Sequence, residues 1–207
     1  MVILFRGSDG RGRDVWPQVE QDLARLLSTR VFPGLKTVAG YKQLLRPDGQ
    51  PDAAACQAAA HAIVHSTDLK DGIKEFGRRE MPKVQEWSKP ICRAHKNNPN
   101  GLWWFDEELV QRWGRNYPPG TPNRKQQILE SIRPMLAVCN DWNDFTNLVV
   151  LRPKPSIPVI TGQGQYKPIY SAKDARHAAF SNVLYIGGYT QCFVPFVNPD
   201  DIAPYMF

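Results

Sequence analysis

The chain has 207 residues, of which 42% are hydrophobic and 22% are charged. This balance excludes a disordered chain and supplies enough apolar residues for one domain with its own core. No run of about 18 apolar residues is present, so we expect no membrane-spanning helix, and the net charge of +6 favours anionic partners. The cations are scattered, which favours a solvated surface over a dedicated nucleic-acid patch.

The first third of the chain predicts a strand and two helices separated by a loop. Residues 2–6 predict a short buried strand, and Asp14 is a candidate cap for a helix with one apolar face. The proline- and glycine-rich segment 30–51 predicts a loop. Asp52 then marks the start of an alanine-rich helix, which we expect to give way to a strand at 63–65.

The rest of the chain changes from helical to strand-like patterns. Asp68 predicts the start of a further helix, and the stretch from about 80 to 145 predicts helices broken by proline and glycine, one of them near 124–139. After Asn147, apolar runs bounded by turn residues predict strands at 148–151, 157–160, 183–186 and 192–194. Strands at both ends with helices between them indicate an α+β fold, which we expect to form one domain over residues 1–207.

Two short segments in the first half carry side chains suited to ligand binding. Arg6 follows an apolar run and precedes Gly7, so its planar guanidinium can hold phosphate or ribose oxygens; the plainer interpretation is a surface arginine. A second apolar run ends in His65, Ser66 and Thr67. The Ser66 hydroxyl can hydrogen-bond a site residue, or the hydroxyls can simply cap the next helix.

A third segment lies near the end of the sequence. A Gly187-Gly188 turn leads into Tyr189, Thr190 and Gln191, and apolar residues follow. Polar side chains at the start of a strand beside a glycine-rich turn are typical of a ligand cleft, although an ordinary hairpin would give the same pattern.

Together these segments resemble the mono-ADP-ribosyltransferases of the cholera-toxin-like, Arg–Ser–Glu group. The residues that match the motifs of this family are Phe5, Arg6, His65, Ser66, Thr67, Phe76, the run 189–194 and Ile202. The family keeps a catalytic glutamate at the position of Gln191. The match covers less than a third of the chain.

The resemblance implies a split pair of small antiparallel sheets flanking an NAD cleft, with a helical insertion at about 80–145. It implies cleavage of NAD at the nicotinamide–ribose bond and transfer of ADP-ribose to a macromolecular acceptor, either protein or nucleic acid. It also implies a toxin or effector that is secreted or delivered into a target cell and is accompanied by an immunity or delivery partner.

The resemblance also assigns roles to residues. Arg6, Ser66 and Gln191 would be catalytic, with Arg6 holding NAD and Ser66 orienting Gln191. The NAD-binding set would be Arg6, Gly7, His65, Ser66, Thr67, Phe76 and Tyr189.

Gln191 changes what the implied site can do. A glutamine can accept the hydrogen bond of a ribose hydroxyl, but it lacks the negative charge opposite the developing cation. Losing about 3–4 kcal/mol from the barrier would slow turnover a few hundredfold or more. Three explanations stay open: an inactivated variant with Gln in place of Glu, which we rank first, a natural non-catalytic relative, or a takeover by another acid such as Asp200 or Asp201.

Two further functions stay open beside the transferase. An NAD glycohydrolase would use the same residues with water as the acceptor. A non-catalytic basic module would instead engage nucleic acid or protein through its cations and through the tryptophans between 87 and 142, although such residues more often form core.

The cysteines and histidines predict no metal site. The four cysteines are widely spaced, which indicates buried thiols or, in an oxidising compartment, one or two disulfides. The four histidines show no metal-ligand spacing with cysteine or with each other. They are His61, His65, His95 and His177.

Overall fold

The computed structural model describes residues 15–66, 69, 82–95, 97–136, 138, 145–163, 167–168, 184–185 and 188–207. The predicted strand at 2–6, the Asp14 cap and the start of a helix at Asp68 lie outside these residues. The helices are α1 (Trp16–Thr29), α2 (Ala39–Lys42), α3 (Ala53–Val64), α5 (Glu107–Gly114) and α6 (Arg124–Leu136), with 3-10 turns η1 (Pro33–Leu35) and η4 (Pro199–Asp201). The strands are β1 (Lys83–Trp87), β2 (Ile91–His95), β3 (Trp103–Asp106), β4 (Asn147–Leu151), β5 (Ile157–Gln163), β6 (Lys167–Pro168), β7 (Leu184–Tyr185), β8 (Thr190–Phe193) and β9 (Ile202–Pro204).

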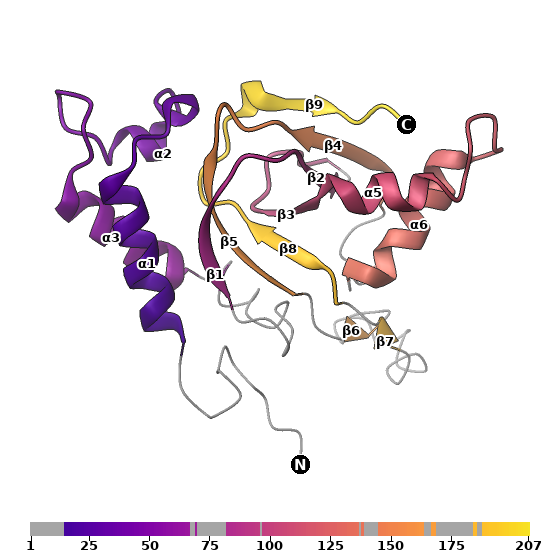
Figure 1. The fold of residues 1–207 in the computed structure, drawn as a ribbon, viewed down its shortest axis with the longest axis horizontal. Helices are drawn as coiled ribbons and strands as arrows, with labels where there is room; N and C mark the ends of the chain where they lie inside the picture. Colours follow the sequence, from indigo (N-terminus) through magenta and orange to yellow (C-terminus); the bar gives the residue numbers. More distant parts are fainter. Residues whose placement is uncertain are drawn as a thin grey trace, which may run out of the picture.

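The strands form a curled antiparallel sheet with helices on either side, which confirms the predicted α+β class (Figure 1). The seven strands of the main sheet run in the order β1-β5-β8-β3-β2-β4-β9, and β6 pairs with β7 in a separate ribbon. The predicted strands at 148–151, 157–160 and 192–194 are confirmed as β4, β5 and β8, except that β8 ends at Phe193. None of the described helices is long and apolar enough to cross a bilayer.

The expectation of a helical insertion at about 80–145 is wrong in its first part. Strands β1, β2 and β3 fall in this stretch and contribute to the main sheet, and only α5 and α6 are helical. The main sheet is therefore larger than the two small sheets that the resemblance implied. Because β1 pairs with β5 and places Lys83 opposite Thr161, these strands depend on partners far along the chain.

Helices α1 and α3 pack side by side next to the sheet (Figure 1). Asp52 caps α3 as predicted, since its carboxylate accepts a hydrogen bond of 2.8 Å from the backbone N–H of Ala55. The strand expected at 63–65 is wrong, because α3 continues through Val64 and the N–H of His65 still bonds to the carbonyl of His61 at 3.0 Å. Burial of Val64 in the core outweighs the preference of β-branched residues for strands.

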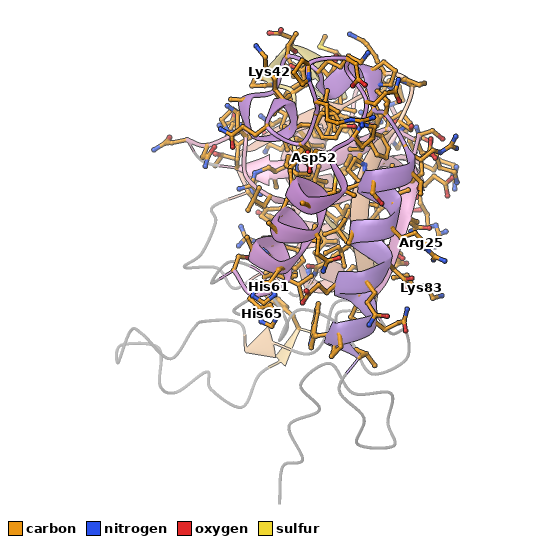
Figure 2. All side chains as sticks on the ribbon, turned by 90° about the vertical axis from the view of Figure 1, so that its left-hand side faces the viewer. Arg25, Lys42, Asp52, His61, His65 and Lys83 are labelled. Carbon is orange, nitrogen blue, oxygen red and sulfur yellow. The ribbon has the colours of Figure 1, made fainter. Side chains whose placement is uncertain are left out.

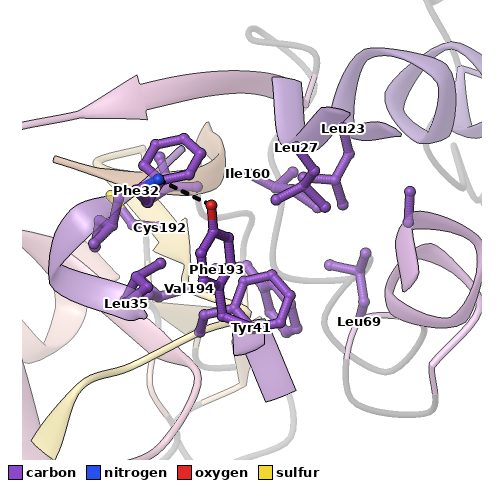
Figure 3. Packing of buried hydrophobic residues seen from close by; sticks show 14 of the residues in the cluster. Leu23, Leu27, Phe32, Leu35, Tyr41, Leu69, Ile160, Cys192, Phe193 and Val194 are labelled. Atoms are coloured by element: carbon purple, nitrogen blue, oxygen red, sulfur yellow. Dashed lines mark hydrogen bonds between the residues drawn. The ribbon is translucent and has the colours of Figure 1, made fainter. Parts of the chain in front are cut away.

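A first core cluster joins α1, α3 and the loop after α1 to one face of the sheet. Tyr41 lies at its centre, where its hydroxyl accepts a hydrogen bond of 2.9 Å from the backbone N–H of Phe32 (Figure 3). Its ring makes edge-to-face contacts with Phe32 and Phe196. The hydrogen bond satisfies a buried donor that no helix or strand would otherwise satisfy.

A second core cluster joins α5 and α6 to the opposite side of the sheet strands. Asp106 caps α5 by accepting a 2.9 Å hydrogen bond from the N–H of Glu108, and Arg112 in the last turn complements the helix dipole. Helix α6 confirms the helix predicted near 124–139, and it buries Ile128, Leu129, Ile132 and Leu136.

Trp104 is buried, and Trp87, Trp103 and Trp113 pack partly buried against the two clusters, which favours core over a base-stacking surface. Trp142 lies outside the described residues.

Three of the four cysteines lie in the described part of the chain, and all three are buried free thiols: Cys56, Cys92 and Cys192. Burial raises the pKa of each of these thiols, so they remain protonated and unreactive at neutral pH. The interpretation of buried thiols holds for these three cysteines.

Candidate functional site

The structure describes four of the predicted site residues: His65, Ser66, Tyr189 and Gln191. The other four lie outside the described residues: Arg6, Gly7, Thr67 and Phe76. The four described residues fall into two groups, one at the start of β8 and one at the end of α3.

Gln191 is a buried polar side chain near the start of β8, with 7% of its surface exposed. It lies opposite Phe105 of β3 and Gly162 of β5. Since directly opposed residues of an antiparallel pair share a face, Gln191 points with Phe105 toward the second core cluster. Its amide nitrogen donates a 2.6 Å hydrogen bond to the carbonyl oxygen of Leu136 at the end of α6.

Gly162 leaves one flank of Gln191 without a neighbouring side chain. A glycine inside a strand often marks a place where a ligand or another backbone approaches closely. Gly162 therefore borders Gln191 from within β5.

Tyr189 precedes Gln191 by two residues and lies beside a cation. The guanidinium of Arg112 donates to the hydroxyl of Tyr189 at 3.4 Å, and its central carbon lies 5.9 Å from the centre of the tyrosine ring. Arg112 is exposed and Tyr189 is half-buried. Gly188 supplies the positive φ of 92° that the chain needs to enter β8 at this point. An exposed positive charge therefore lies at the entrance to the strand that carries Gln191.

Ser66 follows α3 and makes the capping contact that sequence alone also allowed. Its hydroxyl accepts a 3.1 Å hydrogen bond from the N–H of Leu69. Leu69 packs in the first core cluster, whereas the side chain of Gln191 faces the second. Ser66 and Gln191 therefore lie next to different core clusters, and the orienting role of Ser66 stays a prediction of the resemblance.

His65 belongs to a small polar cluster between α1 and α3. One carboxylate oxygen of Glu20 lies 3.2 Å from Nδ1 of His61, and the other lies 3.2 Å from Nε2 of His65. Figure 2 shows both histidines at the same end of α3, next to α1. The expectation that the histidines lack metal-ligand spacing is wrong for this pair, because continuation of α3 through Val64 places residues 61 and 65 one helical turn apart.

Sequence reasoning missed two groups that contact the predicted residues. The Leu136 carbonyl is a backbone atom 55 positions from Gln191, and Arg112 lies 77 positions from Tyr189. Arg112 falls in the stretch predicted to be helical, and that prediction gives no information about the strand that this residue contacts.

Comparison with known proteins gives structural likenesses at low sequence identity. No protein-family model matches the chain, and no curated protein matches it. Among solved structures, Rhs1-CT in complex with its cognate immunity protein RhsI1 matches 62% of this chain and 80% of its own, at 14% identity and a TM-score of 0.34. Tse6 in complex with Tsi6 matches 93% of this chain and 97% of its own, at 11% identity and a TM-score of 0.34.

Proposed function

We propose that this chain is an NAD-cleaving effector that transfers ADP-ribose to a macromolecular acceptor inside a target cell. The observation that carries the proposal is the environment of Gln191: a buried amide fixed near the start of a central strand, with Gly162 on one flank. In the transferases that the sequence resembles, the catalytic glutamate occupies the position that matches Gln191.

Each group at the start of β8 has a role in this proposal. The Leu136 carbonyl holds the amide nitrogen of Gln191, which fixes the plane of the amide and leaves its oxygen to accept a hydrogen bond from a ribose hydroxyl. Arg112 supplies a planar cation suited to the diphosphate of NAD. The half-buried ring of Tyr189 offers an aromatic surface beside both groups.

Gln191 carries no charge, and this sets the expected rate. The oxocarbenium-like transition state gains a hydrogen bond from the amide but no opposing negative charge. Turnover by the chain as it stands is therefore slow. Substitution by glutamate restores the charge and should raise turnover per folded molecule.

The test is nicotinamide release from NAD, measured for the unchanged chain and for Gln191→Glu, Gln191→Ala and Arg112→Ala. Glutamate should raise release and alanine should abolish it. Arg112→Ala should weaken NAD binding by about tenfold, the effect of losing about 1.4 kcal/mol. Arg115→Ala removes a similarly exposed arginine just after α5 and should leave binding unchanged.

Two outcomes would count against the proposal. Failure of every variant to bind NAD or release nicotinamide would remove the NAD function altogether. Release with no labelled macromolecule, when labelled NAD is added to a cell lysate, would leave hydrolysis as the reaction.

A further inference from the structure

We propose that Glu20, His61 and His65 form a binding site for a divalent transition-metal ion of the zinc class, bridging α1 and α3. The inference does not use the residues at the start of β8 on which the NAD proposal rests. Glu20 lies on α1, and the two histidines lie at the end of α3, which packs against α1 (Figure 2 shows the histidines). Among the residues that the structure describes, this is the group of histidine, cysteine and acidic side chains that could hold a metal ion.

The geometry of the three side chains suits one ion. One potential ligand atom from each residue lies within 4.8 Å of the other two. Zinc–nitrogen and zinc–oxygen bonds of about 2.0–2.1 Å in a tetrahedral site place neighbouring ligands roughly 3.3 Å apart. Each carboxylate oxygen of Glu20 lies 3.2 Å from one histidine nitrogen, Oε1 from Nδ1 of His61 and Oε2 from Nε2 of His65, which is close to the spacing of neighbouring ligands. The histidine side chains are 63% and 47% exposed, so they are free to close on an ion without disturbing the core.

The fold supplies two of these ligands in a fixed relation. His61 lies in the last turn of α3 and His65 follows its end, and their rings are 4.4 Å apart between centroids. Glu20 comes from α1 and is mostly buried, with 18% of its side chain exposed. The amide nitrogen of Gln57 lies 3.4 Å from the same carboxylate and helps to orient it, as a second layer of hydrogen bonds does in metal sites.

The chemistry of the ligands selects the class of ion. Two imidazoles and one carboxylate suit zinc and its neighbours in the first transition row rather than calcium or magnesium, which prefer oxygen ligands alone. Three protein ligands leave at least one position of a tetrahedral ion to water. The ion would replace the contacts that each imidazole now makes with Glu20, and it would tie the end of α3 to α1.

The test is isothermal titration of the untagged full chain with ZnCl₂, with no other ligand present. We expect one ion per chain, and we expect Glu20→Gln, His61→Gln and His65→Ala each to weaken zinc affinity about tenfold or more. Asp22→Asn is the matched control, because it removes a partly exposed carboxylate from the same helix, and it should leave the affinity within twofold of the unchanged chain.

Two further readouts separate this site from other modes of binding. Cobalt should give visible absorption bands of tetrahedral strength without the thiolate charge-transfer band that cysteine ligation produces. Zinc should raise the midpoint of thermal unfolding of the unchanged chain more than that of the three variants, because the ion binds the folded state and the variants bind it more weakly. Circular dichroism checks that the variants fold.

The proposal is overturned if the unchanged chain does not bind zinc. It is equally overturned if the three folded variants bind zinc as tightly as the unchanged chain.

Discussion

The amide nitrogen of Gln191 lies 2.6 Å from the carbonyl oxygen of Leu136, so the start of strand β8 is tied to the end of helix α6. A glutamate at this position has no proton to donate when ionised, and its carboxylate would face a carbonyl oxygen in a buried setting. The contact shows how this fold holds a glutamine at this position, and it leaves the three explanations for Gln191 open. It also means that a catalytic gain from glutamate would come with a loss of stability.

Gln191→Glu should lower the free energy of unfolding by about 1–3 kcal/mol at neutral pH, because it removes a buried hydrogen bond and leaves a charge without a partner. The loss should shrink in acid, where a protonated carboxyl can again donate to Leu136. Urea unfolding at neutral and acidic pH measures both effects. The same change at the exposed Gln43 should alter stability by about 0.5 kcal/mol or less. Equal effects at the two positions would show that the amide of Gln191 is not anchored.

Tyr41→Phe should lower the free energy of unfolding by about 1–3 kcal/mol, because it leaves the buried N–H of Phe32 without an acceptor. Chemical denaturation measures the cost, and amide hydrogen exchange should show faster exchange at Phe32. Tyr117→Phe is the matched control: its hydroxyl contacts that of Ser131 at 3.0 Å in a half-buried place that water can reach, so its cost should be smaller. If Tyr41→Phe leaves the free energy of unfolding unchanged, the buried hydrogen bond between Tyr41 and Phe32 is contradicted.

Gly34→Ala should destabilise the protein by about 1–3 kcal/mol, the typical effect of overpacking. A β-carbon at residue 34 would overlap the backbone carbonyl of Lys154, which is not a flexible group. Gly40→Ala is the control, because its β-carbon would make an ordinary contact of 3.7 Å with Phe196 and would favour helix α2. The midpoints of thermal unfolding of the two variants should shift in opposite directions or by clearly different amounts. Equal shifts would show that the backbone carbonyl of Lys154 does not lie against residue 34.

Ser156→Ala should give a loss of stability that depends on pH. The Ser156 hydroxyl donates a 2.6 Å hydrogen bond to Glu86, and this bond, followed by the contact with Arg30, lowers the pKa of Glu86 below its ordinary value of 4.5. A carboxyl group whose pKa is lower in the folded state stabilises the protein above its unfolded pKa, and the contribution is lost as the pH falls through the folded value.

The expected loss in Ser156→Ala is about 0.5–1 kcal/mol at neutral pH, since Glu86 is partly exposed. Below pH 4.5 the difference between variant and unchanged chain should decline. Urea unfolding across this range measures the trend. A difference that stays constant with pH would show that the Ser156 hydroxyl acts through packing rather than through the carboxylate.

The sequence predicts correctly those elements that depend on residues close to one another in the chain. The Asp52 cap and the apolar runs of β4 and β5 follow from neighbouring residues, and the structure confirms them. The strand β1 could not be found in this way, because its side chains do not alternate cleanly and its pairing partner lies more than seventy residues away. The end of α3 was missed because β-branched Ile63 and Val64 favour strands until the core is considered.

The candidate site was predictable to a similar degree. The glycine turn and polar start of β8 pointed to Tyr189 and Gln191, and the structure places both residues beside α5 and α6. Arg112 and the Leu136 carbonyl come from the stretch expected to be an insertion, and only the assembled sheet brings them to β8. The pair His61 and His65 was visible as a four-residue spacing, but its meaning depended on knowing that the helix continues.

The place of β8 between β5 and β3 has a consequence for biosynthesis. Without residues 190–193, the remaining six strands of the main sheet would fall into two separate pieces, one of β1 and β5 and the other of β3, β2, β4 and β9. A growing polypeptide thus carries two unpaired sheet edges until this segment leaves the ribosome, and long-range pairing of this kind folds slowly. The residue that we place at the centre of the NAD site belongs to the segment that joins these edges. Closure of the sheet and completion of the site would therefore be a single late event, and a partly made chain would hold no working site in the cell that produces it.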